Sequence, residues 1–301
     1  MEYIEKWLNE LQEIKPLITD EKPVVEKLEH VKAIIFDIYG TLLVSASGDI
    51  EQAEISGNNL KTALKNAGFS FAEAGMENDD KRTADLLSRF VKLIHKHQDR
   101  HRNNGTPFPE VDIRKVWEDL IEYALMQKIL KKEKDYDPVK LTFIFELLSN
   151  QVWPMPGMKE IIRYLRDKGY PLGIVSNAQF YTPVMMNFFL SGKISSNENI
   201  RFFDPNLTVF SYKLMKAKPD TSIFEPVLKN LKKKYGIHPE ESVFVGNDMY
   251  KDIYAAGSSG MKTIFFAGDK RSLRLRKEQP EVKGLKPDGV ITELAQLKQI
   301  F

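Results

Sequence analysis

The sequence predicts an α/β fold: a doubly wound parallel sheet with an α-helical bundle inserted after its first strand. Three observations predict this fold. The run Ala33–Phe36 is apolar without alternation, which is typical of a strand buried on both faces of a parallel sheet. Residues 47–153 then show helical periodicity and no second strand. From Met158 onward, helix and strand patterns alternate, and repeated β–α units imply a parallel sheet.

The first 31 residues form a segment of their own. Apolar side chains recur at helical spacing between Tyr3 and Leu11, and Pro16 and Pro23 punctuate the chain behind them. We expect residues 1–31 to be a helical extension that packs on the core.

The long helical stretch is typical of a separate bundle. Its apolar stripes lie in Leu86–Ile94, Ile113–Leu125 and Leu141–Leu148. Polar, Gly-containing tracts at Ser45–Gly48 and Pro154–Gly157 bracket it, and we expect two hinge strands there. The core is then 32–46 together with 154–301, and the helical cap is 47–153.

The second half supplies the rest of the sheet. We expect strands at Leu172–Val175, Leu207–Phe210, Ser242–Val245 and Thr263–Phe266. Helices are expected at Lys159–Arg166, at Ile223–Lys234 and at Lys251–Ser258, and another is expected to begin with Thr182 as its N-cap and Pro183 in its first turn. These units complete a Rossmann-like core.

The composition excludes several classes of function. The net charge of +2 arises from 44 basic and 42 acidic residues, which gives no footprint for nucleic acid or a membrane surface. The chain has no cysteine, so disulfides, thiolate chemistry and Cys-ligated zinc are excluded. No apolar run is long enough to span a bilayer, and no basic segment precedes an apolar one at the N-terminus. We therefore expect a cytoplasmic protein.

Four strands of the predicted core run into polar or charged residues. The first ends at Asp37 and the second at Ser176-Asn177, the third precedes Lys218-Pro219-Asp220, and the fourth runs into Asn247-Asp248 with Asp252 beyond. Ligands in open α/β sheets bind beyond the carboxyl ends of the strands, so these side chains should line one crevice.

Such a crevice suits attack on a phosphoryl group. A carboxylate such as Asp37 can form an acyl-phosphate, while Lys218 and the Ser176 hydroxyl hold the phosphoryl oxygens. Asp37, Asp248 and Asp252 repel one another unless a cation lies between them. Hard oxygen ligands with room for water point to Mg²⁺.

At this point the chain resembles the haloacid dehalogenase-like hydrolase superfamily. Four segments in order look like the motifs of that family: Phe36-Asp37-x-x-Gly40-Thr41-Leu42, Ser176-Asn177, Lys218-Pro219-Asp220 and Gly246-Asn247-Asp248-x-x-x-Asp252. The helical insertion stands where the family places its most common cap. The resemblance implies that Asp37 is the nucleophile, that Thr41, Ser176 and Lys218 belong to the catalytic set, and that Asn177 joins Ser176 and Lys218 in holding phosphate. It also implies metal contacts from Asp37, the Tyr39 carbonyl and the fourth motif, where Asn247, Asp248 and Asp252 are the candidates and the sequence leaves open which of them binds the ion directly.

Two residues depart from the family pattern. Phosphatases of the family carry an Asp general acid and base two residues after the nucleophile, where this chain has Tyr39. A phenol is a poor base at neutral pH, so we expect slow turnover or a substrate with a good leaving group. Asn247 stands at the position where the family usually has its first metal-binding aspartate, and we expect weakened Mg²⁺ affinity.

The sequence favours a hydrolase: a Mg²⁺-dependent phosphomonoesterase that acts on a small phosphorylated metabolite through an aspartyl-phosphate. One alternative is a metal-independent 2-haloacid dehalogenase, because those enzymes often carry Tyr at the position of Tyr39. The long loop from Asn247 to Asp252, Phe224 in place of their tyrosine, and the lack of an arginine in the cap before Arg82 argue against it. The other alternative is a weakly active or non-catalytic binding or regulatory protein on the same scaffold.

Overall fold

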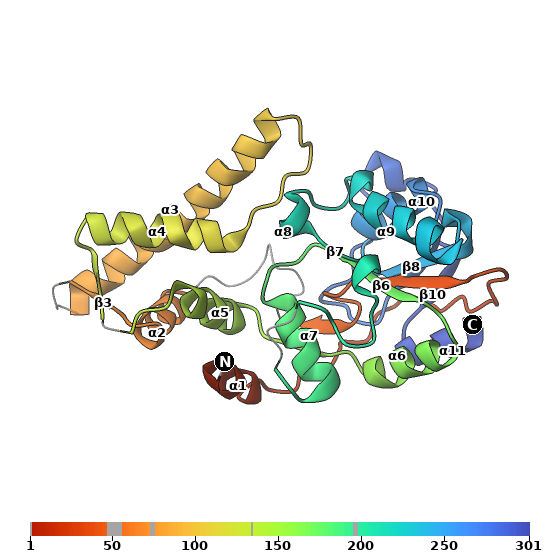
Figure 1. The fold of residues 1–301 in the computed structure, drawn as a ribbon, viewed down its shortest axis with the longest axis horizontal. Helices are drawn as coiled ribbons and strands as arrows, with labels where there is room; N and C mark the ends of the chain where they lie inside the picture. Colours follow the sequence, from red (N-terminus) through yellow and green to blue (C-terminus); the bar gives the residue numbers. More distant parts are fainter. Residues whose placement is uncertain (1, 47–55, 73–75, 134, 195–197) are drawn as a thin grey trace.

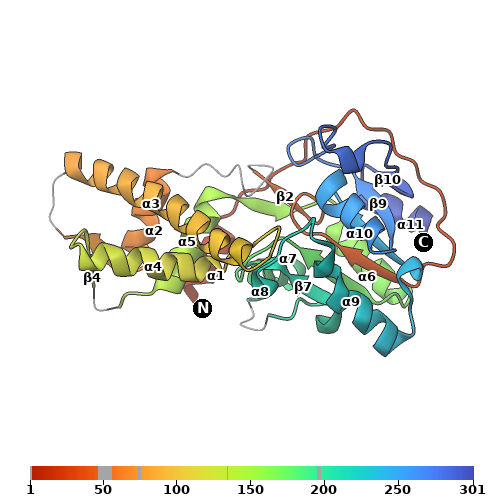
Figure 2. The same ribbon diagram turned by 90° about the horizontal axis from the view of Figure 1, so that it is seen from above.

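A computed structural model describes residues 2–46, 56–72, 76–133, 135–194 and 198–301. The chain forms two lobes, one built on a parallel sheet and one built of helices (Figure 1). Seen from above, the two lobes lie side by side along the long axis and meet near β2 (Figure 2). None of the helices in these ranges is long and apolar enough to cross a membrane.

The core sheet has six parallel strands in the order β10-β9-β8-β1-β6-β7. They are β1 (Ala33–Phe36), β6 (Leu172–Ser176), β7 (Thr208–Phe210), β8 (Ser242–Gly246), β9 (Lys262–Phe266) and β10 (Gly289–Ile291). The first strand lies in the middle, where Phe36 pairs with Ile174 on one side and Val245 on the other. The predicted α/β class with a doubly wound parallel sheet is confirmed.

Helices cover both faces of this sheet because the strands are apolar on both faces. Ile34 and Phe36 belong to one buried cluster, whereas Ala33 and Ile35 belong to another, since successive strand residues point to opposite sides. The helices of this lobe are α6 (Met158–Asp167), α7 (Thr182–Ser191), α8 (Ser211–Leu214), α9 (Glu225–Asn230), α10 (Ala255–Ser258) and α11 (Leu297–Ile300).

Several of these helices continue into 3₁₀-helical or π-helical segments. The 3₁₀ segments are η2 (Pro205–Leu207), η3 (Thr221–Phe224), η5 (Pro239–Glu241), η7 (Pro280–Val282) and η8 (Leu294–Gln296). The π-helical segments are η4 (Leu231–Tyr235) and η6 (Met249–Tyr254). The helix expected at Ile223–Lys234 is thus a succession of η3, α9 and η4. The one expected at Lys251–Ser258 consists of η6 and α10.

Along the chain, the helical lobe is inserted between two short strands, β2 (Leu43–Ser45) and β5 (Val152–Pro154), which pair antiparallel. Its helices are α2 (Gly57–Asn66), α3 (Met76–Asn103), α4 (Ile113–Met126) and α5 (Pro138–Ser149). An antiparallel pair, β3 (Phe69–Phe71) with β4 (Leu130–Lys132), was not expected because three residues are too few to show alternation. Part of the predicted cap, residues 47–55, lies outside the described residues.

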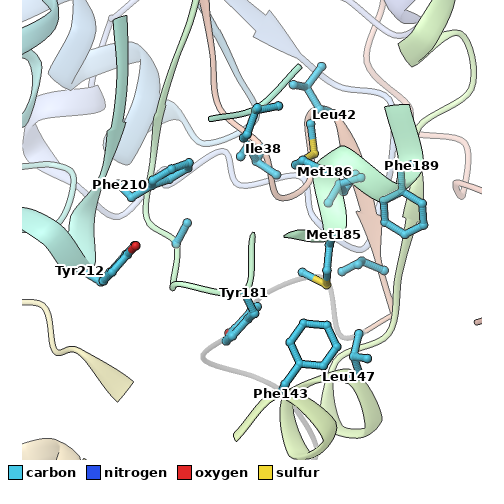
Figure 3. Close-up of a cluster of buried hydrophobic side chains, with 14 of the residues drawn as sticks. Ile38, Leu42, Phe143, Leu147, Tyr181, Met185, Met186, Phe189, Phe210 and Tyr212 are labelled. Carbon is cyan, nitrogen blue, oxygen red and sulfur yellow. The ribbon is translucent and has the colours of Figure 1, made fainter. Parts of the chain in front are cut away.

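Helix α5 joins the helical lobe to the core. Its side chains Phe143 and Leu147 lie beside Tyr181 and Met185, which come from the start of α7 and the residue before it (Figure 3). All four side chains are buried. The contact is apolar and continuous with the core, so α5 is held against the face of α7.

The expectation of a helix over residues 1–31 is wrong for most of that segment. Helix α1 covers only Glu2–Asn9 and packs against α5, and residues 10–31 form an extended strap along the core. The strap takes its hydrogen bonds from the core: Val24 forms an antiparallel bridge with Val290, and Leu17 N donates to Asp269. The prolines at 16 and 23 lack the N–H groups that a helix needs.

Candidate active site

The carboxyl edge of the sheet brings three charged side chains together. Asp37 follows β1 directly, and Lys218 Nζ donates to Asp37 Oδ1 at 2.7 Å and to Asp252 Oδ1 at 2.5 Å. All three side chains are buried. Residues that are 181 and 34 positions apart in sequence thus form one carboxylate–ammonium–carboxylate cluster.

The charges of this cluster stabilise one another. Burial opposes the charge on Lys218, but Asp252 and Asp37 outweigh it and raise the pKa of the ammonium group above its ordinary value. Burial, together with Asp37 and Asp248, raises the pKa of Asp252, and Lys218 opposes this shift. Lys218 thus places one positive charge between the two carboxyl groups.

Two residues at the end of β6 differ in what they contact. The Ser176 hydroxyl is fully buried and has no hydrogen-bond partner among the described residues. The Asn177 side chain is engaged instead: its Oδ1 accepts from Lys218 N at 2.8 Å and its Nδ2 donates to Lys218 O at 3.2 Å. Asn177 therefore fixes the main chain of Lys218, whereas Ser176 is left with an unsatisfied polar group.

The first and fourth motifs meet at Asn247. Its Oδ1 accepts from Thr41 Oγ1 at 3.2 Å, and its Nδ2 donates to the Ser272 carbonyl at 2.6 Å. Gly40 adopts a left-handed φ of 81°, and a Cβ there would lie 2.4 Å from Asn247 Nδ2. The site consequently needs glycine at 40, and Thr41 acts on the orientation of Asn247.

The side-chain oxygens of Asp248 have partners outside the Asp37 cluster. Its Oδ1 accepts from the N–H groups of Tyr250 and Lys251, as the N-cap of η6. Its Oδ2 accepts from Arg276 Nε at 3.0 Å and from Nη2 at 2.7 Å. The described ranges contain no group of three or more His, Asp or Glu residues placed to share a metal. The expected gathering of three carboxylates is therefore not met, because Arg276 and the helix end engage Asp248.

Other residues than Asp248 still offer oxygen donors for a divalent cation. Within the described ranges, Asp37 Oδ2 and the Tyr39 carbonyl accept no hydrogen bond, and Asn247 offers an amide oxygen. A carboxylate, a carbonyl and an amide are oxygen ligands of the kind that Mg²⁺ prefers. The residues present therefore fit a divalent cation.

Tyr39 is turned toward the cap. Its hydroxyl forms a 2.8 Å hydrogen bond with Thr182 Oγ1, and α7 starts with Thr182 as its first residue rather than its N-cap. Burial raises the pKa of Tyr39 above its ordinary value, and Glu146 and Asp37 raise it further. The phenol consequently stays protonated and offers no base at neutral pH.

A buried carboxyl lies near Tyr39 that sequence reasoning missed. Glu146 of α5 accepts from Tyr181 Oη at 3.0 Å, and burial raises its pKa to about 7 although the Tyr181 bond lowers it. A cavity of about 10 Å³, room for about one water, is lined in part by Tyr39, Glu146 and Tyr181. A single charged residue within the apolar run Leu141–Leu148 was the signal that could have revealed it.

The cap also contacts the segments that flank Ser176 and Lys218. Gln179 Oε1 accepts from Ile113 N at 3.1 Å and its Nε2 donates to Val111 O at 2.8 Å. Ala217 N donates to Phe108 O at 2.9 Å, one residue before Lys218. No periodicity or motif marks Gln179 for this role. The loop 108–113 is thus docked on both segments of the core that carry the site.

The chain is similar to known proteins in fold and in sequence. A 2-haloacid dehalogenase from Pseudomonas syringae has a similar fold, with a TM-score of 0.54, 18% sequence identity, and coverage of 90% of this chain and 97% of that one. A glyceraldehyde 3-phosphate phosphatase of Methanothermobacter thermautotrophicus is 26% identical over 90% of this chain and its own whole length. One of Pyrococcus furiosus is 31% identical over 55% of this chain, and that match spans 58% of the relative's length. Residues 31–260 match the family model for haloacid dehalogenase-like hydrolases. The chain belongs to this family of hydrolases.

Proposed function

We propose that this hydrolase is a phosphomonoesterase in which Asp37 is the nucleophile. The observation that carries the proposal is the buried Ser176 hydroxyl, which lacks a partner among the described residues at the end of β6. Strand β6 is the direct neighbour of β1, the strand that ends at Asp37. Buried polar groups are rarely left unpaired, and a phosphoryl oxygen placed over Asp37 would satisfy this one.

The cluster around Asp37 suits an in-line displacement. Lys218 holds Oδ1 of Asp37, and the Asp37 carboxylate attacks phosphorus. A bond from the Asp37 carboxylate to phosphorus forms as the bond to the substrate's ester oxygen breaks. That oxygen takes a proton from water, and the proton is regained when the water that attacks in the second step loses one. Water then attacks the aspartyl-phosphate at phosphorus and releases inorganic phosphate and the free carboxylate. Lys218 and Ser176 would stabilise the charge on the phosphoryl oxygens in both steps.

Mg²⁺ is the proposed cofactor. Asp37, the Tyr39 carbonyl and Asn247 would hold it, and Asp252 would contribute negative charge through the Lys218 cluster. When bound, the ion supplies positive charge opposite the phosphoryl oxygens. Asp248 is not assigned to it, because both oxygens of that carboxylate already have partners.

The names of the relatives indicate the substrate class, and the leaving group should determine how fast each ester reacts. Tyr39 stands where a carboxylic acid would protonate the departing alcohol, so esters of acidic alcohols should react fastest. The curated relatives are named glyceraldehyde 3-phosphate phosphatases, and that name supports a small phosphorylated aldehyde or sugar as the substrate. The docked loop 108–113 would exclude water from it.

The dehalogenase alternative is disfavoured by the position of Phe224. Dehalogenases of the family place a tyrosine at this position, whereas Phe224 is fully buried and packs edge-to-face on Phe244, with ring centroids 5.2 Å apart. A phenyl ring held in the core offers no polar contact to a substrate.

A direct assay tests the proposal. We expect Mg²⁺-dependent release of phosphate from glyceraldehyde 3-phosphate and of p-nitrophenol from its phosphate ester, both abolished in Asp37→Asn. Phe224→Tyr serves as a control on the core side. Chloride release from 2-chloropropionate without metal would contradict the proposal, as would a folded protein that turns over no phosphate ester in a broad panel with Mg²⁺.

A further inference from the structure

The loop between β9 and β10 runs along the fourth motif. Arg274 N donates to Asn247 O at 3.2 Å, and Met249 N donates to Arg274 O at 2.9 Å, so the two segments lie side by side. The Ser272 carbonyl accepts from Asn247 Nδ2 in the same stretch. This loop therefore sets how the side chains of Asn247 and Asp248 are presented.

Arg276 is the residue of this loop that acts on Asp248. Two of its guanidinium N–H groups converge on the single oxygen Oδ2, at 3.0 and 2.7 Å. The Asp248 side chain is 8% exposed and that of Arg276 is 24% exposed, so the pair is largely shielded from water. Arg276 also has a φ of 48°, in the left-handed region that non-glycine residues rarely adopt. The backbone is bent where the guanidinium turns back toward Asp248.

We propose that Arg276 is a positioning residue that withholds Asp248 from the cation site and leaves neutral Asn247 as the ligand from the fourth motif. The inference rests on the Mg²⁺ site of the proposed function. With Arg276 in place, the charge of Asp248 is neutralised and both of its oxygens are engaged. Without it, a buried carboxylate loses its counter-charge, and a divalent cation is the partner that would relieve it.

Magnesium binding, measured by titration calorimetry on the full chain, tests this directly. We expect Arg276→Gln to lower the Kd for Mg²⁺ about tenfold, the lower end of the effect of residues that orient metal ligands. Arg274→Gln is the matched control, because it removes the same charge from the same loop. The guanidinium that it removes donates to the carbonyls of Arg271 and Leu273. Its Kd should stay within about twofold of the wild type, since that guanidinium does not hold Asp248.

A double variant shows whether Arg276 acts through Asp248. The gain in affinity should disappear in Asp248→Asn/Arg276→Gln, since no carboxylate is then freed. If the glutamine variant does not fold, Arg276→Met, which also lacks the charge, takes its place with the same expected shift.

The outcomes separate this inference from the function on which it rests. Wild-type binding with equal Kd values for Arg276→Gln and Arg274→Gln would overturn the role of Arg276 and leave the magnesium site intact. A gain that persists in the double variant would also overturn it. Absence of binding in every folded variant would overturn the magnesium site itself, and this inference with it.

Discussion

Replacing Tyr39 with aspartate should raise turnover of substrates that have poor leaving groups. Tyr39 stands two residues after Asp37, and its hydroxyl is hydrogen-bonded to the Thr182 side chain rather than directed to a leaving group. Burial and the charges of Glu146 and Asp37 raise the pKa of the phenol. The same surroundings would raise the pKa of a carboxyl at position 39, so the introduced side chain would keep the proton that it must donate.

The size of the effect follows from what the substitution adds and removes. A positioned general acid is worth about 10²–10⁴-fold in rate, or about 3–5 kcal/mol of activation free energy. On the stability side, loss of the bond to Thr182 costs about 1 kcal/mol. Loss of a partly buried aromatic ring costs about 2–3 kcal/mol more, below the range for a fully buried one. The variant should therefore be less stable but more active on demanding substrates.

The assay compares leaving groups in three proteins. For the wild type, Tyr39→Asp and the isosteric control Tyr39→Asn, kcat/KM is measured on p-nitrophenyl phosphate and on an alkyl phosphate. Of the two introduced side chains, only the carboxylic acid can donate a proton, and of the two leaving groups, only the alkoxide needs one. We expect a gain of about 100-fold for the aspartate variant over the asparagine variant on the alkyl ester and little change on the aryl ester. An equal change on both esters, or equal rates for the two variants, would refute the reasoning.

Three further substitutions test other parts of the site. Glu146→Gln should remove a pH dependence of stability. The fold raises the pKa of Glu146 from 4.5 to about 7, so the unfolding free energy of the wild type should fall by about 3 kcal/mol between about pH 5 and 8 relative to that of the variant. An equal difference between the urea midpoints of the two proteins at both pH values would contradict this. Asn247→Asp should lower the unfolding free energy in the absence of Mg²⁺ by about 1–3 kcal/mol, because a carboxylate oxygen would face the Ser272 carbonyl; an unchanged urea midpoint would exclude that contact. Gln179→Met should leave two buried main-chain groups of the cap loop unpaired, and hydrogen exchange over 108–113 should become about tenfold faster while that of β1 is unchanged.

The sequence predicted the parts of the site that parallel-sheet topology determines. Asp37, Ser176 and the Asn247–Asp252 loop each lie at or just beyond the end of a buried apolar strand, and parallel strands end at one edge of the sheet. Their convergence needs only the strand pattern. Lys218 lies eight residues beyond the end of β7, and its placement depended on the motif rather than on the pattern.

What the sequence did not predict depends on partners without any periodic signal. Asp248 looked like a metal ligand, but Arg276 lies 28 positions away in an irregular loop, and nothing in the pattern links the two. The strap at residues 10–31 was missed because its hydrogen bonds come from distant core edges. The strand β10 has three residues, too few for a pattern to indicate.

Under the proposed mechanism, the two departures from the family pattern would act on different steps, and their contacts show why they can be separated. Tyr39 bonds to Thr182 on the cap side, and a change there alters the proton that leaves with the alcohol. Asn247 and Asp248 are held by the loop from Ser272 to Arg276, and a change there alters the charge that faces a cation. The described side chains of these two groups share no hydrogen bond, although each lies next to a part of the Asp37 motif. On the proposed function, magnesium affinity and sensitivity to the leaving group should therefore respond to different side-chain substitutions, and a single count of acidic residues in the motifs predicts neither.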